Sequence, residues 1–164
     1  MQIIASAEGH IDAPARRVYR YIRDFREHHP RFLPPQFSDL QIETGGVGAG
    51  TVHSFNMTLG GRTTAYRVRV GEPEPGRVLI ESDPSRRMLT TFTVDSDGGG
   101  GSRVRIETRW HTNGVQGSIE RLVAPRMLRR VYLAELALLD RYAHAAVPDT
   151  HPGVPAGAGV ISMV

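Results

Sequence analysis

The sequence predicts an α+β fold in which an antiparallel sheet of about seven strands packs against one long C-terminal helix. Three observations predict it. Apolar and polar residues alternate through most of residues 39–113, which is the pattern of strands with one buried face. Glycine-rich stretches separate these strands, and connections this short join antiparallel neighbours. A helical pattern of apolar residues then runs from about residue 116 to residue 146.

An opening strand and a first helix precede the sheet region. Residues 2–11 have the alternation of a strand, and Asp12 is expected to cap the next helix, with Pro14 in its first turn. The helix should end before Pro30, so that residues 27–40 form a short second helix or a turn. The apolar residues that mark the buried face of the first helix are Val18, Ile22 and Phe25.

The strands of the sheet region are expected to turn their apolar residues to one dry face. Glycines at 45–50, 60–61 and 98–101 should form turns, and the first group lacks the spacing and the following helix of a nucleotide-binding loop. The residues expected on the dry face are Leu40, Ile42, His53, Phe55, Met57, Leu59, Tyr66, Val68, Val70, Val78, Ile80, Met88, Thr90, Phe92, Val94, Val104, Ile106, Thr108 and Trp110.

The C-terminal helical segment carries an apolar stripe that includes Tyr132. Pro125 interrupts the segment and predicts a kink, or a short helix that feeds a longer one. Leu133 and Leu138 widen the stripe beyond one face, so a monomer or a weak homodimer is expected. Residues 147–164 are rich in Pro, Gly and Ala, which predicts a flexible tail after a single domain over residues 1–146.

Composition excludes several kinds of chemistry. The chain has no cysteine, and all 20 of its basic residues are arginine, so disulfides, thiol nucleophiles, Schiff-base lysines and a Walker lysine are ruled out. A net charge of +3 without a basic block does not favour nucleic-acid binding. The adjacent His28 and His29 point in different directions and cannot grip one metal together, so no metal or other cofactor is expected.

The pattern of apolar residues also bears on location. No apolar run approaches the roughly 20 residues that cross a bilayer, so no membrane span is expected. The first residues lack the basic start and apolar stretch of a signal peptide, and the expected location is therefore cytoplasmic.

Six segments, taken in order, resemble one known superfamily. They are HIDAPARRVYRYIRDF (10–25), HHPRFLPPQFSDL (28–40), GGVGAGTVHSFNM (45–57), EPEPGRVLIE (72–81), SRVRIETRW (102–110) and the final helix. Over about residues 1–146 the chain resembles the START-like polyketide cyclase/dehydratase and lipid-transport superfamily. The resemblance implies a helix-grip fold, with two short helices after the first strand and a curved sheet wrapped around the C-terminal helix. It also implies an apolar cavity between sheet and helix for a lipid-like or polyketide-like ligand.

In such a fold the dry face and the last helix supply the ligand-binding residues, although a packed core would use the same side chains. The expected ligand-binding residues are Phe55, Met57, Tyr66, Thr90, Phe92, Thr108, Trp110 and Tyr132. The resemblance places four further residues at the pocket mouth: His28, His29, Phe32 and Phe37. The alternative for this segment is a solvated loop with two surface histidines.

Two residues are candidates for catalysis. His53 lies on an otherwise apolar strand face and could act as a general base, or it could be a hydrogen-bonded core histidine. Glu135 interrupts the most apolar part of the last helix. In a cavity its carboxyl would have a raised pKa and could act as an acid, whereas at the surface it would be an ordinary ion-paired glutamate.

Three functions follow from these observations. The leading hypothesis is the binding of a hydrophobic small molecule without chemistry, because few polar residues are expected to converge on the dry face. The alternative is a polyketide cyclase or dehydratase whose polar pocket residues transfer protons. A third is action on a macromolecular partner such as the ribosome, through Arg121, Arg126, Arg129 and Arg130.

Overall fold

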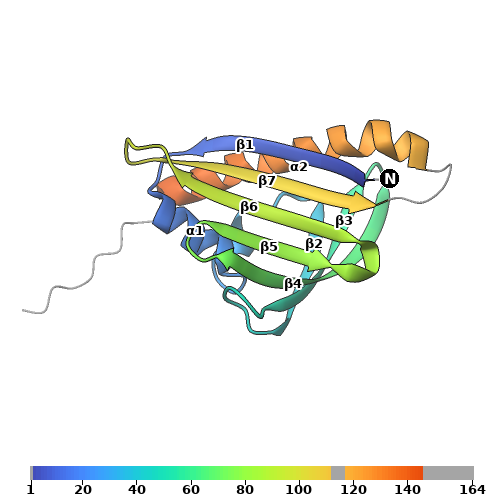
Figure 1. The fold of residues 1–164 in the computed structure, drawn as a ribbon, viewed down its shortest axis with the longest axis horizontal. Coiled ribbons are helices and arrows are strands. Elements are labelled where there is room, and N and C mark those ends of the chain that lie inside the picture. The colour runs from blue at the N-terminus through green and yellow to red at the C-terminus, as the bar shows by residue number, and fades with distance from the viewer. Residues whose placement is uncertain (1, 112–116, 146–164) are drawn as a thin grey trace, which may run out of the picture.

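A computed structural model describes residues 2–111 and 117–145, with side chains over 2–111 and 123–145 (Figure 1). The predicted tail at 147–164 lies outside these residues. The described elements are β1 (Gln2–Ile11), α1 (Ala15–Arg23), the 3-10 helix η1 (His29–Phe32), β2 (Phe37–Thr44), β3 (Val52–Leu59), β4 (Arg62–Glu74), β5 (Val78–Asp83), the 3-10 helix η2 (Pro84–Arg86), β6 (Met88–Ser96), β7 (Ser102–His111) and α2 (Gly117–Ala145).

The strands form one antiparallel sheet in the order β1-β7-β6-β5-β4-β3-β2. Strand β1 pairs with β7 along its whole length, so the first strand lies beside the last one. Figure 1 shows the sheet curving around α2, which packs against β1, with α1 on the same side of the sheet. This arrangement confirms the predicted helix-grip fold, and η1 is the predicted short second helix.

The hydrophobic core lies between the inner face of the sheet and the two α-helices. Val18 and Ile22 of α1 are fully buried, and so is Val104 of β7. Leu139 of α2 is only 2% exposed. Burial of such apolar side chains contributes about 1.5–3 kcal/mol each, and this drives the sheet to close around α2.

One local prediction about the helices is wrong, and one of the two alternatives in another is excluded. Asp12 does not cap α1: Pro14 occupies the N-cap position, and no side chain bonds the helix terminus there. The backbone N–H of Asp12 instead donates to Asp140 Oδ1 at 2.8 Å, which ties the strand end to α2. Pro125 lies inside one continuous helix, which excludes a short helix that feeds a longer one, whereas the predicted kink stays a prediction.

The predicted face of β5 is also wrong. Leu79 and Glu81 are buried, whereas Val78 and Ile80 are only partly buried. Directly opposed residues of an antiparallel pair share a face, and Glu81 lies opposite Thr90 of β6. The pairing with β6 therefore turns Glu81 inward.

A buried carboxylate holds α1, β4 and the glycine-rich loop together. Glu72 accepts hydrogen bonds from the Tyr19 hydroxyl at 2.8 Å and from Arg23 Nε at 2.9 Å. It also accepts from the Ala49 N–H in the loop between β2 and β3, at 2.8 Å. The hydrogen bond from Arg23 is the largest cause that lowers the pKa of Glu72 to about 2. The carboxylate is therefore ionised and ties α1 and the loop between β2 and β3 to β4.

Across the described ranges, the structure contains no helix with the length and apolar character needed to cross a membrane.

Candidate functional site

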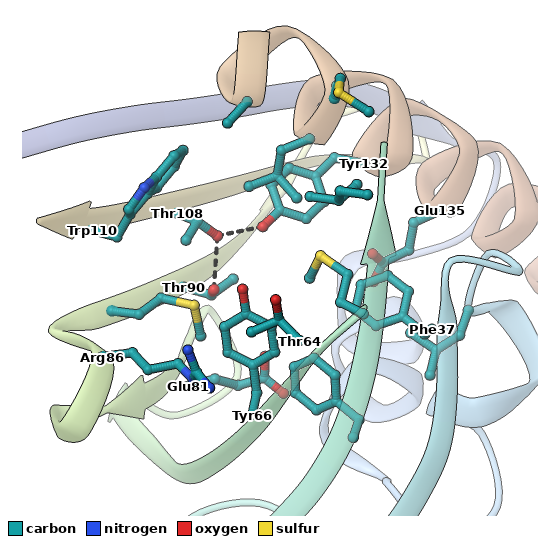
Figure 2. A pocket seen from close by; sticks show the side chains of 18 of the residues that line it. Phe37, Thr64, Tyr66, Glu81, Arg86, Thr90, Thr108, Trp110, Tyr132 and Glu135 are labelled. Atoms are coloured by element: carbon teal, nitrogen blue, oxygen red, sulfur yellow. Dashed lines mark hydrogen bonds between the residues drawn. The ribbon is translucent and has the colours of Figure 1, made fainter. Parts of the chain in front are cut away.

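A cavity of about 900 Å³ lies between the inner face of the sheet and α2 (Figure 2). Strands β3 to β7 supply most of its walls, and α2 supplies one side. In Figure 2, Trp110 and Arg86 lie toward one end of the cavity and Glu135 and Phe37 toward the other. The curvature of the sheet keeps these walls apart, so side chains on the inner face reach the cavity without filling it.

All the residues that were expected to bind a ligand line this cavity. They are Phe55, Met57, Tyr66, Thr90, Phe92, Thr108, Trp110 and Tyr132. The two candidate catalytic residues, His53 and Glu135, line it as well. Their contact with a ligand stays a prediction, and Phe55, Met57, Phe92 and Tyr132 also belong to the buried hydrophobic core.

The four residues expected at the pocket mouth fall into two groups. His29 and Phe37 line the cavity, whereas His28 and Phe32 do not. Phe32 is 1% exposed and belongs to the core. The His28 Nδ1 hydrogen-bonds the Tyr142 hydroxyl at 2.7 Å. The surface-loop alternative is wrong for His29, which is 4% exposed and stacks on Phe25 with ring centroids 4.7 Å apart.

Several lining residues were not predicted, above all Glu81, Phe25 and Arg86. Glu81 could have been predicted to face the cavity only from its position opposite Thr90. That position is known only once the register between β5 and β6 is known. Arg86 comes from the short helix η2, and its guanidinium lies 5.0 Å from the centre of the Tyr66 ring. Such cation–π contacts hold a positive charge over an aromatic wall.

His53 of β3 and Glu81 of β5 form a buried hydrogen-bonded pair across the inner face of β4. His53 Nε2 lies 3.0 Å from Glu81 Oε1, and both side chains are at most a tenth exposed. Burial opposes ionisation of Glu81, but the hydrogen bond and the charge of His53, together with the charge of His29, lower its pKa overall. Glu81 is therefore a carboxylate, and His53 Nε2–H donates to it.

The other nitrogen of His53 is unusual because it is buried without a hydrogen-bond partner among the described residues. In a neutral imidazole whose Nε2 carries the hydrogen, Nδ1 is an acceptor with a free lone pair. Buried polar atoms in proteins are rarely left unpaired, and the exceptions concentrate at sites with a chemical role. When the ring is neutral, this free lone pair gives His53 the electronic arrangement of a general base.

His29 and Glu135 form a second buried pair in the same cavity, with His29 Nε2 and Glu135 Oε1 3.7 Å apart. Burial lowers the pKa of His29, and its Nδ1–H donates to the Ile22 carbonyl at 2.6 Å. Burial, with the charge of Glu81, raises the pKa of Glu135 to about 8. Both groups are therefore neutral at pH 7, and this contact is between an imidazole lone pair and a protonated carboxyl rather than an ion pair.

A third polar group consists of three hydroxyls, called here the hydroxyl triad: Thr90, Thr108 and Tyr132. Thr90 and Thr108 lie opposite each other on β6 and β7, with their Oγ1 atoms 2.7 Å apart. Thr108 Oγ1 is also hydrogen-bonded to the Tyr132 hydroxyl. Figure 2 shows the triad between the two ends of the cavity. Burial raises the pKa of Tyr132, so its hydroxyl stays protonated.

These groups give the cavity a defined chemistry. Glu135 can donate a proton, the His53–Glu81 pair can accept one, and the triad can hydrogen-bond an oxygen. Among the residues that the structure describes, no group of three histidine or carboxylate side chains is arranged to hold a metal ion. The site is thus built from acids, bases and hydroxyls set in apolar walls.

Fold and cavity together define a helix-grip protein with an internal pocket. The sequence profile of the polyketide cyclase/dehydrase and lipid transport family matches residues 2–144. The chain belongs to this family. A comparison with curated proteins finds no match.

Solved structures share the fold. The KanY protein is 29% identical, with a TM-score of 0.77 over 88% of this chain and 99% of the other. The Zhui aromatase/cyclase from Streptomyces sp. R1128 is 16% identical, with a TM-score of 0.70 over 88% and 94% of the two chains. Norcoclaurine synthase from Thalictrum flavum, in complex with dopamine and hydroxybenzaldehyde, is 16% identical, with a TM-score of 0.63 over 86% of each chain.

Proposed function

We propose that this protein binds a hydrophobic small molecule in the cavity between the sheet and α2. The observation that carries the proposal is the cavity itself, about 900 Å³ and walled by aromatic and aliphatic side chains with a few placed polar groups. Pockets of roughly 300–1,000 Å³ with this composition are the usual sites for small ligands. Membership of a family described by polyketide cyclisation and lipid transport supports the same ligand classes.

The second candidate function is a polyketide cyclase or dehydratase activity. It is favoured by two carboxyl groups in one cavity whose pKa values are displaced in opposite directions, Glu81 downward and Glu135 upward. Environments that separate two carboxyls in this way divide them into a base and an acid. The expectation that polar groups would be scarce in the pocket is wrong, because Glu81 and His29 also face it.

A balanced reaction follows from these assignments. The His53 lone pair removes a proton from the carbon next to a ketone, and the positive charge that His53 gains is stabilised by Glu81. The electron pair of that C–H bond forms a C=C bond, and a hydroxyl on the neighbouring carbon leaves. Glu135 protonates this hydroxyl as its C–O bond breaks, so the products are an enone and water. The carboxylate left on Glu135 then regains the proton held by His53.

Action on a macromolecular partner remains a separate prediction. Arg126, Arg129 and Arg130 are exposed on α2, and Arg121 lies outside the residues whose side chains are described. An RNA interaction that is undetectable, or insensitive to salt, would remove this function.

The first experiment is native mass spectrometry of the purified protein, paired with a denatured spectrum of the same sample. A mass excess that disappears on denaturation supports the proposed binding function, and its value identifies the ligand class. If no excess is seen, 9-fluorenone, a ketone with a flat apolar body, is titrated into the protein. Failure of both measurements contradicts the proposal.

Substitutions of cavity-lining residues then test where the molecule binds. Replacement of Trp110 or Tyr66 by alanine should weaken binding about tenfold, because each removes an aromatic wall of the cavity. Leu89→Ala is the control, since Leu89 is exposed on the outer face of β6. Unchanged affinity in both aromatic variants would place the ligand elsewhere. If the captured ligand is also converted, His53→Gln and Glu135→Gln should abolish conversion while affinity stays within a few fold.

A further inference from the structure

The outward side of α2 carries a surface rich in arginine. The helix packs mainly on β1, and also on η1 and β3, so its other side faces solvent (Figure 1). At about 100° per residue, the exposed positions between 123 and 145 fall within one arc of about 160°. The other exposed residues of this arc are alanines and one histidine. The arc is called here the basic face, and its large side chains are Val123, Arg126, Arg129, Arg130, Leu133 and Arg141.

The arginines of the basic face differ from those of the sheet in their partners. On the outer face of the sheet, Arg67 and Arg105 each pair with a glutamate, at 2.7 Å and 2.6 Å. Among the residues that the structure describes, no carboxylate is in ion-pair contact with Arg129, Arg130 or Arg141. The charges of these three arginines are therefore open to an anionic partner.

Acidic side chains do not offset this charge. Residues 123–145 contain two of them, Glu135 and Asp140. Glu135 is buried against the cavity, and Asp140 is partly buried and accepts a hydrogen bond from the Asp12 backbone. The Asp12 carboxylate lies 3.7 Å from His144 at the C-terminal end of the helix. The rest of the basic face is positive, and such a field attracts polyanionic surfaces.

Two exposed apolar side chains lie among the arginines. Val123 is 47% exposed and Leu133 is 37% exposed. On the helix surface Leu133 falls between Arg129 and Arg130. At the surface of a bilayer, such apolar side chains enter the boundary between headgroups and acyl chains, while arginines bind the phosphates. Val123 also lines the cavity, so contact through this face would bring one edge of the cavity to the bilayer.

The composition of the basic face favours a lipid surface over RNA or a folded protein. Residues 123–145 contain no Ser, Thr, Asn or Gln to supply a fixed pattern of hydrogen bonds. Their two aromatic residues, Tyr132 and Tyr142, are buried and partly buried, so neither is presented for stacking on bases or as an interface anchor. A second copy of the chain would place arginines against arginines across a two-fold axis. Anionic headgroups require neither a fixed pattern nor a ring.

We propose that the basic face of α2 docks on a membrane surface that contains anionic phospholipids. The guanidinium groups donate hydrogen bonds to the lipid phosphates, and Val123 and Leu133 enter the apolar boundary. The contact is peripheral and reversible, because it involves one side of a helix whose other side packs in the core. Docking requires no molecule in the cavity, so it goes beyond the proposed binding function.

Cosedimentation with lipid vesicles tests this docking. Vesicles of phosphatidylcholine are compared with vesicles in which about one third of the lipid is phosphatidylglycerol, which is anionic. Arg129→Gln/Arg130→Gln removes two charges from the basic face. The matched control, Arg67→Gln/Arg105→Gln, removes the same charge from the outer face of the sheet, where both arginines are paired.

The wild-type protein and the control should bind the anionic vesicles at least about tenfold more tightly than phosphatidylcholine vesicles. This binding should weaken as salt rises from about 0.05 M to about 0.5 M. Arg129→Gln/Arg130→Gln should lower the affinity for anionic vesicles at least about tenfold. Equal losses in the two double variants would assign the binding to net charge and overturn the proposal, as would a wild-type protein that does not bind.

RNA is the competing partner for the same arginines. A single-stranded oligouridine is therefore titrated into the same proteins at the same salt concentrations. Oligouridine binding that is tighter than vesicle binding and is lost in Arg129→Gln/Arg130→Gln would overturn membrane docking in favour of RNA. None of these outcomes bears on the binding of a small molecule in the cavity, which native mass spectrometry measures separately.

A second measurement does not depend on the folding of the arginine variants. The chain has no cysteine, so Leu133→Cys and Leu89→Cys each provide one site for an environment-sensitive fluorophore. Leu133 and Leu89 are 37% and 36% exposed, so both labels start at similarly exposed positions. With anionic vesicles, emission from the label at residue 133 should shift to shorter wavelength, whereas emission from the label at residue 89 should not change. No shift at residue 133, or equal shifts at both residues, would overturn the proposal.

Discussion

The carboxylate of Glu81 helps to keep Glu135 protonated. Both side chains face one cavity, and the negative charge of Glu81 adds to burial in raising the pKa of Glu135 to about 8. Burial opposes ionisation of Glu81, but its hydrogen bond from His53 keeps it ionised. One carboxylate is thus stabilised by histidines, and its charge stabilises the acid form of the other. This relationship gives the cavity a base and an acid at the same pH.

The first prediction concerns stability against pH. The pKa of Glu135 lies near 8 in the folded protein, compared with 4.5 as its ordinary value. Between these values the folded state holds a proton that the unfolded state has released, so stability falls as the pH rises from 4.5 to 8. Glu135→Gln removes this dependence. Denaturant unfolding at pH 5 and pH 8 should show the wild-type protein losing at least about 2 kcal/mol relative to the variant.

Other titrating groups near Glu135 also change stability with pH, so the measurement needs a control. The lowered pKa of His29 has the opposite effect, since it reduces stability as the pH falls below 6.5. His29 and Glu81 are present in both proteins, so the difference between them isolates Glu135. Glu27→Gln, at a side chain 71% exposed, should follow the wild-type curve. Parallel curves for Glu135→Gln and the wild-type protein would show that Glu135 is ionised at neutral pH.

The second prediction concerns the histidine tautomers. His29 Nδ1–H donates to the Ile22 carbonyl, and burial lowers the pKa of the ring. His29 should therefore be neutral at pH 7, with its hydrogen on Nδ1. His53 should carry a hydrogen on Nε2, because that nitrogen bonds Glu81. Long-range ¹H–¹⁵N NMR correlations distinguish these forms, and an imidazolium signal for His29 at pH 6.5 would mean an ion pair with Glu135.

The overall fold could be predicted because its signals are local. The strict alternation in β3 and β7 and the glycine turns at 60–61 and 98–101 each depend on neighbours along the chain. The alternation in β6 and β7 likewise predicted that Thr90 and Thr108 share the inner face. Their hydroxyls are hydrogen-bonded to each other there.

The missed residues depend on contacts between distant segments. In β5 the apolar Val78, Leu79 and Ile80 occupy both parities, so alternation alone does not say which face is buried. The decision comes from pairing with β6. His28 and His29 look alike in sequence, but only His29 stacks on Phe25 and enters the cavity. No periodicity in the segment between α1 and β2 distinguishes them.

The third prediction concerns Glu72, whose side chain is 7% exposed and pairs with Arg23. Glu72→Gln should reduce the free energy of unfolding at pH 7 by about 2–3 kcal/mol, because three donors lose their carboxylate. The pKa of Glu72 is about 2, below its ordinary 4.5. Its contribution is therefore complete above pH 4.5 and is lost as the pH falls toward 2. The gap between variant and wild-type protein should narrow over that range in denaturant unfolding.

Glu74 provides a matched control on the same strand. Its side chain is 56% exposed and pairs with Arg77 at the surface. Surface ion pairs contribute little, so Glu74→Gln should change the free energy of unfolding by less than about 0.5 kcal/mol. Equal effects of the two substitutions would show that the Glu72 contacts do not hold α1 and β4 together.

The fourth prediction separates backbone strain from steric overlap in the glycine-rich loop. Gly48 and Gly50 have φ values of 65° and 87°, a region that side chains rarely adopt. A Cβ on Gly50 would meet open space, whereas a Cβ on Gly48 would lie 2.2 Å from the Arg23 guanidinium and 2.4 Å from Glu72 Oε2. Gly50→Ala should therefore cost about 1–2 kcal/mol, which is the strain of the left-handed backbone alone.

Gly48→Ala adds the displacement of the Arg23–Glu72 pair to the same strain. It should cost at least about 2 kcal/mol more than Gly50→Ala in denaturant unfolding. The extra cost should disappear when Glu72→Gln is already present, because the contacts that Gly48→Ala disturbs have then been weakened. Additive effects of Gly48→Ala and Glu72→Gln would show that the loop tolerates a side chain at residue 48 without moving Arg23, and that the two sites act independently.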